Sequence, residues 1–226
     1  MSNLSGYFRH ALFLALSLPV IGLVGCNRPT SMNAAAATHP DTSKEQASVA
    51  PPAALPADAS QGDDLANFAK ALHVQCEDAS KGRGCTAGNM EAGDFYDIAL
   101  STNCSAEGFF AGVSEPDAPL LDTLPVTGSK AQINARLSDG QFVCVQATAH
   151  AGQQSAYYYV VGLPVASIPA CRGKPICNQY GDRPITFVAQ HKSGKACALI
   201  DGARPEGDCA QGWVEPQQLD VFSNGI

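Results

Sequence analysis

The hydrophobic positions of this chain follow three successive patterns. An unbroken apolar run, "ALFLALSLPVIGLV", extends over residues 11–24, and residues 27–62 then contain almost no large apolar side chain. From residue 63 onward, apolar residues recur with the periods of helices or strands until the chain ends. The sequence therefore divides into a leader, a polar linker and a folded part of residues 63–226.

The folded part begins with a helical pattern in residues 63–73, "DDLANFAKALH". Asp63 or Asp64 would serve as the N-cap of this helix. Its apolar side chains fall on one face, as the helical period requires: Leu65, Phe68, Ala69 and Leu72. Glycines then interrupt residues 81–94, which predicts a loop.

Beyond this loop the dominant period is two, which is typical of strands. Residues 96–101 alternate, and residues 131–137 place Ala131, Ile133, Ala135 and Leu137 on one face. "SDG" and then "QFVCVQATA" follow, which predicts a β-hairpin that turns at Asp139-Gly140. Further short strands are expected in four segments, residues 156–163, 185–191, 196–200 and 219–222, and "KSGK", residues 192–195, is expected to turn one of them back.

These patterns define the fold class. The folded part is predicted to be mainly β, a disulfide-rich small barrel or sandwich with one short N-terminal helix. The chain carries 21 glycines and 15 prolines, which suits a fold with many turns. A boundary near residue 165 between two smaller units stays open.

The leader has the features of a secretory signal peptide. Its first ten residues carry Arg9 and no acid, and the apolar run is shorter than the roughly 20 residues that span a bilayer. The run ends in "LVGC", residues 23–26, which resembles the lipobox of bacterial lipoproteins. That resemblance implies a signal peptide of residues 1–25, cleavage before Cys26, and acyl chains such as palmitate on that cysteine.

The residue after Cys26 bears on the location. In the lipoprotein family's sorting rule an Asp at this position retains the protein at the inner membrane, whereas this chain has Asn27. The resemblance therefore implies an outer-membrane anchor, on the periplasmic face or the outer surface. Residues 26–62, rich in Ala, Pro, Ser and Thr, are predicted to be a disordered tether with an r.m.s. span of roughly 35 Å.

The remaining eight cysteines predict four disulfides, because an even number in an exported chain is typical of a disulfide framework. Zinc prefers closer pairs in tandem, and no C-x-x-C redox motif occurs. Eight cysteines allow 105 connectivities, and the sequence cannot choose among them. The preferred one is sequential, because it closes short loops: Cys76–Cys85, Cys104–Cys144, Cys171–Cys177 and Cys197–Cys209. "CRGKPIC", residues 171–177, would then be a rigid basic loop, or else a simple connector.

Charge narrows the choice of partner. The formal net charge is −7, which argues against nucleic acid. Residues 84–129 contain no Lys or Arg but several acids, so they form either a solvated surface or a docking surface for a basic protein. "SEPDAP", residues 114–119, is a proline-stiffened loop that could enter a cleft. The candidate contact residues are Glu115, Asp117 and Asp122.

Aromatic residues add two candidates, Tyr158 and Trp213, with core packing as the alternative for both. Three consecutive tyrosines, residues 157–159, cannot all face one way on a strand, so some must point outward or cover a second layer. "GWVEPQQL", residues 212–219, resembles the closing segment of bacterial SH3-like domains, and residues 118–149 are loosely similar to their turn-rich strands. The resemblance implies one or two SH3-like units and peptidoglycan as a ligand, although this chain lacks the usual mid-domain Trp.

Catalytic and metal-binding motifs are not found in the sequence. His73, His150 and His191 lie outside any H-E-x-x-H pattern, and neither G-x-S-x-G nor a calcium loop occurs. The chain is therefore predicted to have no metal and no cofactor and not to be an enzyme. The first hypothesis is a binding module that inhibits a basic cell-wall hydrolase or toxin. The second is a wall-binding module, and the third is a hydrolase assembled from distant residues.

Overall fold

The computed structural model describes residues 58–105, 108–223 and 225–226. The leader, Cys26 and most of the predicted tether lie outside these residues. The described elements follow in the order α1 Asp58–Ala71, η1 Ala79–Lys81, β1 Cys85–Ala87, η2 Met90–Ala92, β2 Tyr96–Leu100, β3 Phe109–Val113, β4 Ala118–Leu121, β5 Ile133–Leu137, β6 Phe142–Ala151, β7 Gln154–Gly162, η3 Val165–Ser167, η4 Pro169–Cys171, α2 Ile176–Gln179, β8 Ile185–Phe187, β9 Ala198–Ile200, β10 Arg204–Glu206, β11 Gln211–Val214, η5 Pro216–Gln218 and β12 Leu219–Val221.

The predicted N-terminal helix is α1, which begins at Asp58 rather than at Asp63, so residues 58–62, which were assigned to the tether, belong to the helix. Its expected apolar face is buried, with Ala69 and Leu72 only 2% and 5% exposed. Phe68 lies edge-on to Tyr159 with 5.6 Å between the ring centroids. The helix is therefore held by packing against β7.

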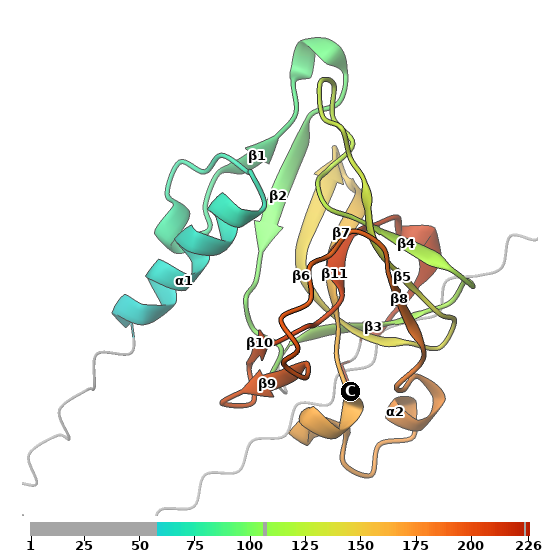
Figure 1. Ribbon diagram of the computed structural model, residues 1–226. Helices are drawn as coiled ribbons and strands as arrows, with labels where there is room; N and C mark the ends of the chain where they lie inside the picture. Colours follow the sequence, from blue (N-terminus) through green and yellow to red (C-terminus); the bar gives the residue numbers. More distant parts are fainter. Residues whose placement is uncertain (1–57, 106–107, 224) are drawn as a thin grey trace, which may run out of the picture. The chain divides into compact units, whose positions relative to one another are not determined.

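The strands form mainly antiparallel ladders, which confirms the predicted class of a mainly β fold (Figure 1). The main sheet has the order β1-β2-β6-β7-β11-β4-β5-β8, while β3 pairs with both β6 and β12, and β9 pairs with β10. One edge of β6 serves two partners, since Phe142–Val145 pairs with β3 and Ala147–His150 pairs with β2. A register shift between Val145 and Ala147 separates the two partners.

The central strands β6, β7 and β11 are buried on both faces, so the fold contains two cores. The buried members of the aliphatic core are all Ala, Val or Leu: Ala111, Val113, Ala118, Leu120, Ala135, Leu137, Val143, Val145, Val160, Ala210, Val214 and Leu219. The aromatic–cystine core lies on the other face, and its largest members are Phe110, Phe142, Tyr159, Tyr180 and Trp213. Short irregular elements and α1 supply the cover of this second core.

All four disulfides have the sequential connectivity, which confirms that preference: Cys76–Cys85, Cys104–Cys144, Cys171–Cys177 and Cys197–Cys209. Every one of these cysteines belongs to the aromatic–cystine core or packs against it. The bridges do not separate two units near residue 165, because β7, which precedes that point, pairs with β11, which follows it. The described chain after residue 58 is a single unit.

The prediction of a β-hairpin that turns at Asp139-Gly140 is wrong. The alternation in residues 131–137 is confirmed from Ile133 onward, and Gly140 does turn with a φ of 77°. However, the amide of Gly140 donates to the carbonyl of Val113 (2.8 Å), and its carbonyl accepts from Gly181 (2.8 Å). Because these segments take the hydrogen bonds beside the turn, β5 pairs with β4 and β8 while β6 pairs elsewhere.

The expectation for "KSGK" is also wrong, because β8 pairs with β5 and β9 pairs with β10. The carboxylate of Asp208 holds this loop instead, by accepting from the amides of Ser193 (2.7 Å) and Gly194 (2.8 Å). The sequence patterns missed five strands, namely β1, β3, β4, β10 and β11. The first, β1, lies within the predicted loop, and β3 is buried along nearly its whole length, so its sequence does not alternate.

Candidate functional site

The end of the β1–β2 hairpin forms the most prominent exposed feature of the acidic span (Figure 1, top). We call residues 88–95 the β1–β2 tip. It contains η2, where the side-chain carbonyl of Asn89 accepts from the amide of Glu91 (2.8 Å) and Gly93 ends the turn with a φ of 77°. The turn is thus a capped, defined structure rather than an irregular loop.

Asp94 connects the tip to the rest of the sheet. One oxygen of its carboxylate accepts from the amide of Asn89 (2.8 Å), and the other accepts from the amide of Thr127, which lies in the loop between β4 and β5. These bonds, above all those with Thr127, hold the pKa of Asp94 below its usual value. Gly88 has φ 82°, and a Cβ there would lie 1.9 Å from the carbonyl oxygen of Asp94.

The base of the tip is also covalently held, since β1 begins at Cys85, which is bonded to Cys76. Beneath the tip, Tyr96 and Tyr157 lie edge-on with ring centroids 6.0 Å apart. Partial burial raises the pKa of both hydroxyls, with Asp94 adding to the effect at Tyr96. The tip is therefore preorganised by hydrogen bonds, aromatic packing and a disulfide.

The tip exposes an apolar side chain beside a carboxylate. Met90 is 73% exposed, and among large hydrophobic residues of the described chain only Val188, at 58%, is comparable. Glu91 is exposed next to it. Methionine adapts its shape to many apolar surfaces, and exposed apolar anchors of this kind are typical of binding sites.

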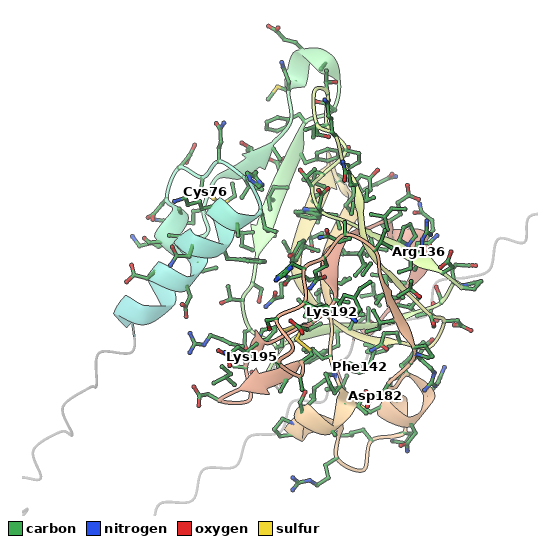
Figure 2. The ribbon with its side chains drawn as sticks, viewed as in Figure 1. Cys76, Arg136, Phe142, Asp182, Lys192 and Lys195 are labelled. Carbon is green, nitrogen blue, oxygen red and sulfur yellow. A yellow bond between two sulfur atoms is a disulfide. The ribbon has the colours of Figure 1, made fainter. Side chains whose placement is uncertain are left out.

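The three acids proposed from the sequence lie elsewhere. "SEPDAP" is a tight turn between β3 and β4, in which Asp117 has φ 62° and forms an ion pair with Arg136 (3.1 Å). Arg136 is labelled in Figure 2. Asp122 lies beyond the other end of β4, where it accepts from the amide of Gln132 (2.8 Å). Glu115 and Asp117 are therefore separated from Asp122 by the length of β4.

The three consecutive tyrosines, residues 157–159, pack on both faces of their strand, which is the predicted alternative in which they cover a second layer. Tyr157 and Tyr159 contact the aromatic–cystine core, whereas Tyr158 packs on the aliphatic core and lies edge-on to Phe109 (6.0 Å between centroids). Trp213 is fully buried against Tyr159 with 5.4 Å between centroids. The prediction that Trp213 contacts a partner is therefore corrected, because its side chain is part of the core.

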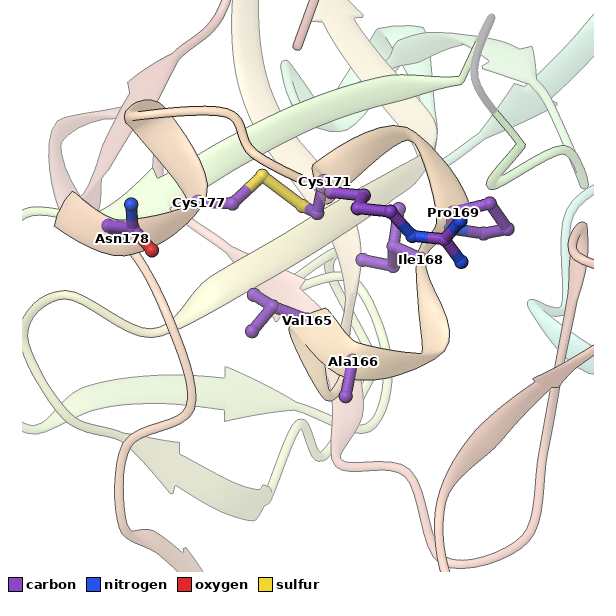
Figure 3. A pocket seen from close by; sticks show the side chains of 8 residues that line it. Val165, Ala166, Ile168, Pro169, Cys171, Cys177 and Asn178 are labelled. Atoms are coloured by element: carbon purple, nitrogen blue, oxygen red, sulfur yellow. A yellow bond between two sulfur atoms is a disulfide. The ribbon is translucent and has the colours of Figure 1, made fainter.

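The "CRGKPIC" segment is closed by its disulfide, which favours the rigid-loop alternative. Beside it lies a cavity of about 270 Å³, lined by the bridge and by Val165, Ile168 and Pro169, with Arg172 at its wall (Figure 3). Two further cavities of about 250 and 230 Å³ lie under α1 and between β7 and β8.

The histidines are not gathered into one site. His73 follows α1, His150 faces Asp97 across the β2–β6 ladder, and His191 lies in the loop after β8. Within the described residues no three acidic, histidine or cysteine side chains form a group suited to a metal ion. In the same residues no helix is both long and apolar enough to cross a membrane.

No family model, no curated protein and no solved structure matches the chain.

Proposed function

We propose that this protein is a non-catalytic binding module that docks a basic protein of the bacterial periplasm through its β1–β2 tip. The partner class is a cell-wall hydrolase or an antagonistic toxin, which docking would inhibit. The observation that carries this proposal is the rigid tip that presents Met90 beside Glu91. Cys26 anchors the module to the outer membrane by its acyl chains.

Preorganisation favours such docking, because a loop that is already ordered loses little entropy on binding. The tip belongs to residues 84–129, a span without Lys or Arg, so a basic partner would be steered toward it. Met90 would fill an apolar depression of the partner, while Glu91 would meet a cation at its rim. This division between an apolar anchor and a charged rim is typical of protein interfaces.

The test compares two equal charge reversals on two exposed turns. A basic muramidase serves as the probe, and its binding to the full chain and its lytic rate are measured. We expect Glu91→Lys to weaken both binding and inhibition at least about tenfold, which corresponds to about 1.4 kcal/mol. Glu115→Lys should leave both nearly unchanged, because "SEPDAP" lies in a different turn.

Met90→Ser provides an independent variant, since the side chain is exposed and its replacement should not alter the unfolding midpoint. Inhibition that survives both tip variants, or that Glu115→Lys removes equally, would contradict the proposal. If the muramidase does not bind the wild-type protein, the same comparison of variants is made with a panel of basic periplasmic toxins.

The membrane anchor is tested separately. Cys26→Ser should move the protein from the membrane fraction to the soluble periplasmic fraction and abolish incorporation of labelled palmitate. Asn27→Asp should shift the acylated protein toward the inner membrane. Retention of the Cys26→Ser protein in the outer membrane would contradict the anchor.

A second candidate is an SH3-like wall-binding module. The short η5 turn between β11 and β12, with β12 returning to pair with β3, supports it, and "GWVEPQQL" lies across this turn. Co-sedimentation with purified peptidoglycan distinguishes the two candidates. A wall-binding module would sediment with peptidoglycan whether or not Glu91 is reversed.

A further inference from the structure

The cavity under α1 brings together side chains that the tip does not use. It has a volume of about 250 Å³. Residues from α1, the loop after β2, the central strands and β10 line it: Asp64, Phe68, Ala71, Thr102, Gln146, Tyr159, Arg204, Pro205 and Gln211. Apolar and polar side chains therefore share one small cavity.

The charged groups of this cavity balance each other. The guanidinium of Arg204 bonds to the carboxylate of Asp64 at 3.3 Å, so one cation and one anion sit together at the wall. A ligand with a net charge would gain from one of them and be repelled by the other. A neutral group that both donates and accepts hydrogen bonds can use both.

Two buried polar side chains turn toward the cavity from the sheet. Gln146 is only 6% exposed, and its amide nitrogen donates to the carbonyl of Thr102 (3.3 Å). Among the described residues, neither the Oε1 atom of Gln146 nor the hydroxyl of Tyr159 has a hydrogen-bond partner, although both residues line the cavity. Burial raises the pKa of the Tyr159 hydroxyl, so it keeps its proton and can donate.

Phe68 forms the apolar wall, held edge-on to Tyr159. The β10 residues of the lining are held to the chain after β2, since the amide of Cys104 donates to the carbonyl of Ala203 (2.9 Å), next to Arg204. Cys104 is itself bonded to Cys144 of β6. These contacts hold parts of the lining in place before any ligand arrives, which lowers the entropic cost of binding.

We propose that this cavity binds one neutral pyranose unit of a glycan. A sugar ring has an apolar C–H face, which suits Phe68, and hydroxyls that donate and accept together, which suit the Asp64–Arg204 pair. The volume lies just below the roughly 300–1,000 Å³ typical of ligand pockets, which limits the occupant to a single ring. Gln146 Oε1 and the Tyr159 hydroxyl would complete the polar contacts.

The test uses the full chain with three probes: methyl β-glucopyranoside, methyl N-acetyl-β-glucosaminide and methyl β-glucuronide. Saturation-transfer NMR and titration calorimetry measure binding. We expect at least one neutral glycoside to bind with a dissociation constant on the order of millimolar. The anionic glucuronide should bind more weakly than the neutral glucoside.

Variants assign the binding to the cavity. Tyr159→Phe should weaken glycoside binding about three- to tenfold. The unfolding midpoint should stay constant, because the hydroxyl forms no hydrogen bond with the described residues that the variant would lose. Asp64→Asn should weaken it similarly. Tyr180→Phe serves as the control, since the Tyr180 hydroxyl bonds to Asp220 outside the cavity, and it should leave glycoside binding unchanged.

Three results would overturn the proposal: no binding of either neutral glycoside, binding that is equal in wild type, Tyr159→Phe and Asp64→Asn, or a preference for the glucuronide. Each is independent of the tip, because Glu91 and Met90 do not line the cavity.

Discussion

The two cores of this fold meet at the same strands but are held together in different ways. The aliphatic core is enclosed by ladders of β3, β4, β5, β6, β7, β11 and β12, and its buried members are all Ala, Val or Leu. The aromatic–cystine core is covered by α1, by 3-10 turns and by loops, and all four disulfides lie there. Regular strands thus enclose one side, and covalent bonds hold the other.

This difference has a physical reason. Each strand of the aliphatic core is fixed by neighbours on its ladder, so side-chain packing alone can define it. A 3-10 turn of three residues buries too little apolar area to offset its own ordering entropy. A disulfide reduces that cost, because it already restricts the unfolded chain. Both candidate sites lie on the disulfide-held side, where loops can project without losing their shape.

The largest expected effect concerns the disulfides themselves. Replacing Cys104 and Cys144 together by Ala should lower the free energy of unfolding by about 4 kcal/mol, because this bridge closes a separation of 40 residues. The same change at Cys171 and Cys177, separated by 6, should cost about 2 kcal/mol. Urea titrations of the two double variants measure this order. Equal losses would show that strain or packing, rather than chain entropy, dominates.

Truncating two neighbouring leucines compares how much packing in each core contributes to stability. Leu120 is fully buried in the aliphatic core, whereas Leu121 points to the other side and is half-buried. We expect Leu120→Ala to cost about 3 kcal/mol and Leu121→Ala about half as much, by the same urea titration. A larger loss at Leu121 would mean that the disulfide-held side carries more packing energy than its exposure suggests.

A hydrogen bond joins the end of α2 to β12. The hydroxyl of Tyr180 donates to the carboxylate of Asp220, which raises the pKa of Tyr180 to about 12. The stabilisation is therefore complete below pH 10 and is lost as the pH rises toward 12. Tyr180→Phe should cost about 1 kcal/mol at neutral pH.

The same variant should lose less stability between pH 10 and pH 12 than the wild type does. Part of the alkaline loss should remain, because the pKa values of Tyr96, Tyr157 and Tyr159 are also raised. Identical pH profiles for the two proteins would contradict the assigned role of Tyr180.

The smallest expected effect is at the "SEPDAP" turn. Asp117 is 70% exposed where it pairs with Arg136, so Asp117→Asn should change the free energy of unfolding by less than about 0.5 kcal/mol. Thermal unfolding at low and high salt measures this. A loss above about 1 kcal/mol would show that the β4–β5 hairpin depends on the ion pair.

Local patterns predicted much of the fold and little of the site. The alternation at Ile133, Ala135 and Leu137 and the helical face of α1 follow from spacing, whereas spacing gave only a preference for the sequential disulfides. The pairing of β5 does not, because the carbonyls and amides beside Gly140 bond to Val113 and Gly181, which are distant in sequence. Such competition among backbone hydrogen-bond partners produces no recognisable pattern in the sequence of either segment.

The tip was missed for a related reason. Glycines in residues 81–94 indicated a loop, and they do permit turns at Gly88 and Gly93. What makes the tip rigid is Asp94 bonding to Thr127, a contact across 33 positions of sequence. Trp213 illustrates the opposite error, since an aromatic residue near a turn can be either a surface contact or, as here, fully buried.

The most direct test of the proposed function is photo-crosslinking in cells. A photoreactive amino acid replaces Met90 in one full-length variant and Glu115 in a matched control, both exposed positions in turns. We predict that the variant at residue 90 forms an adduct with a basic periplasmic protein and that Glu91→Lys in the same chain abolishes it. The control at residue 115 should form no such adduct. An adduct from residue 115 alone, or equal adducts from both positions, would contradict docking through the β1–β2 tip.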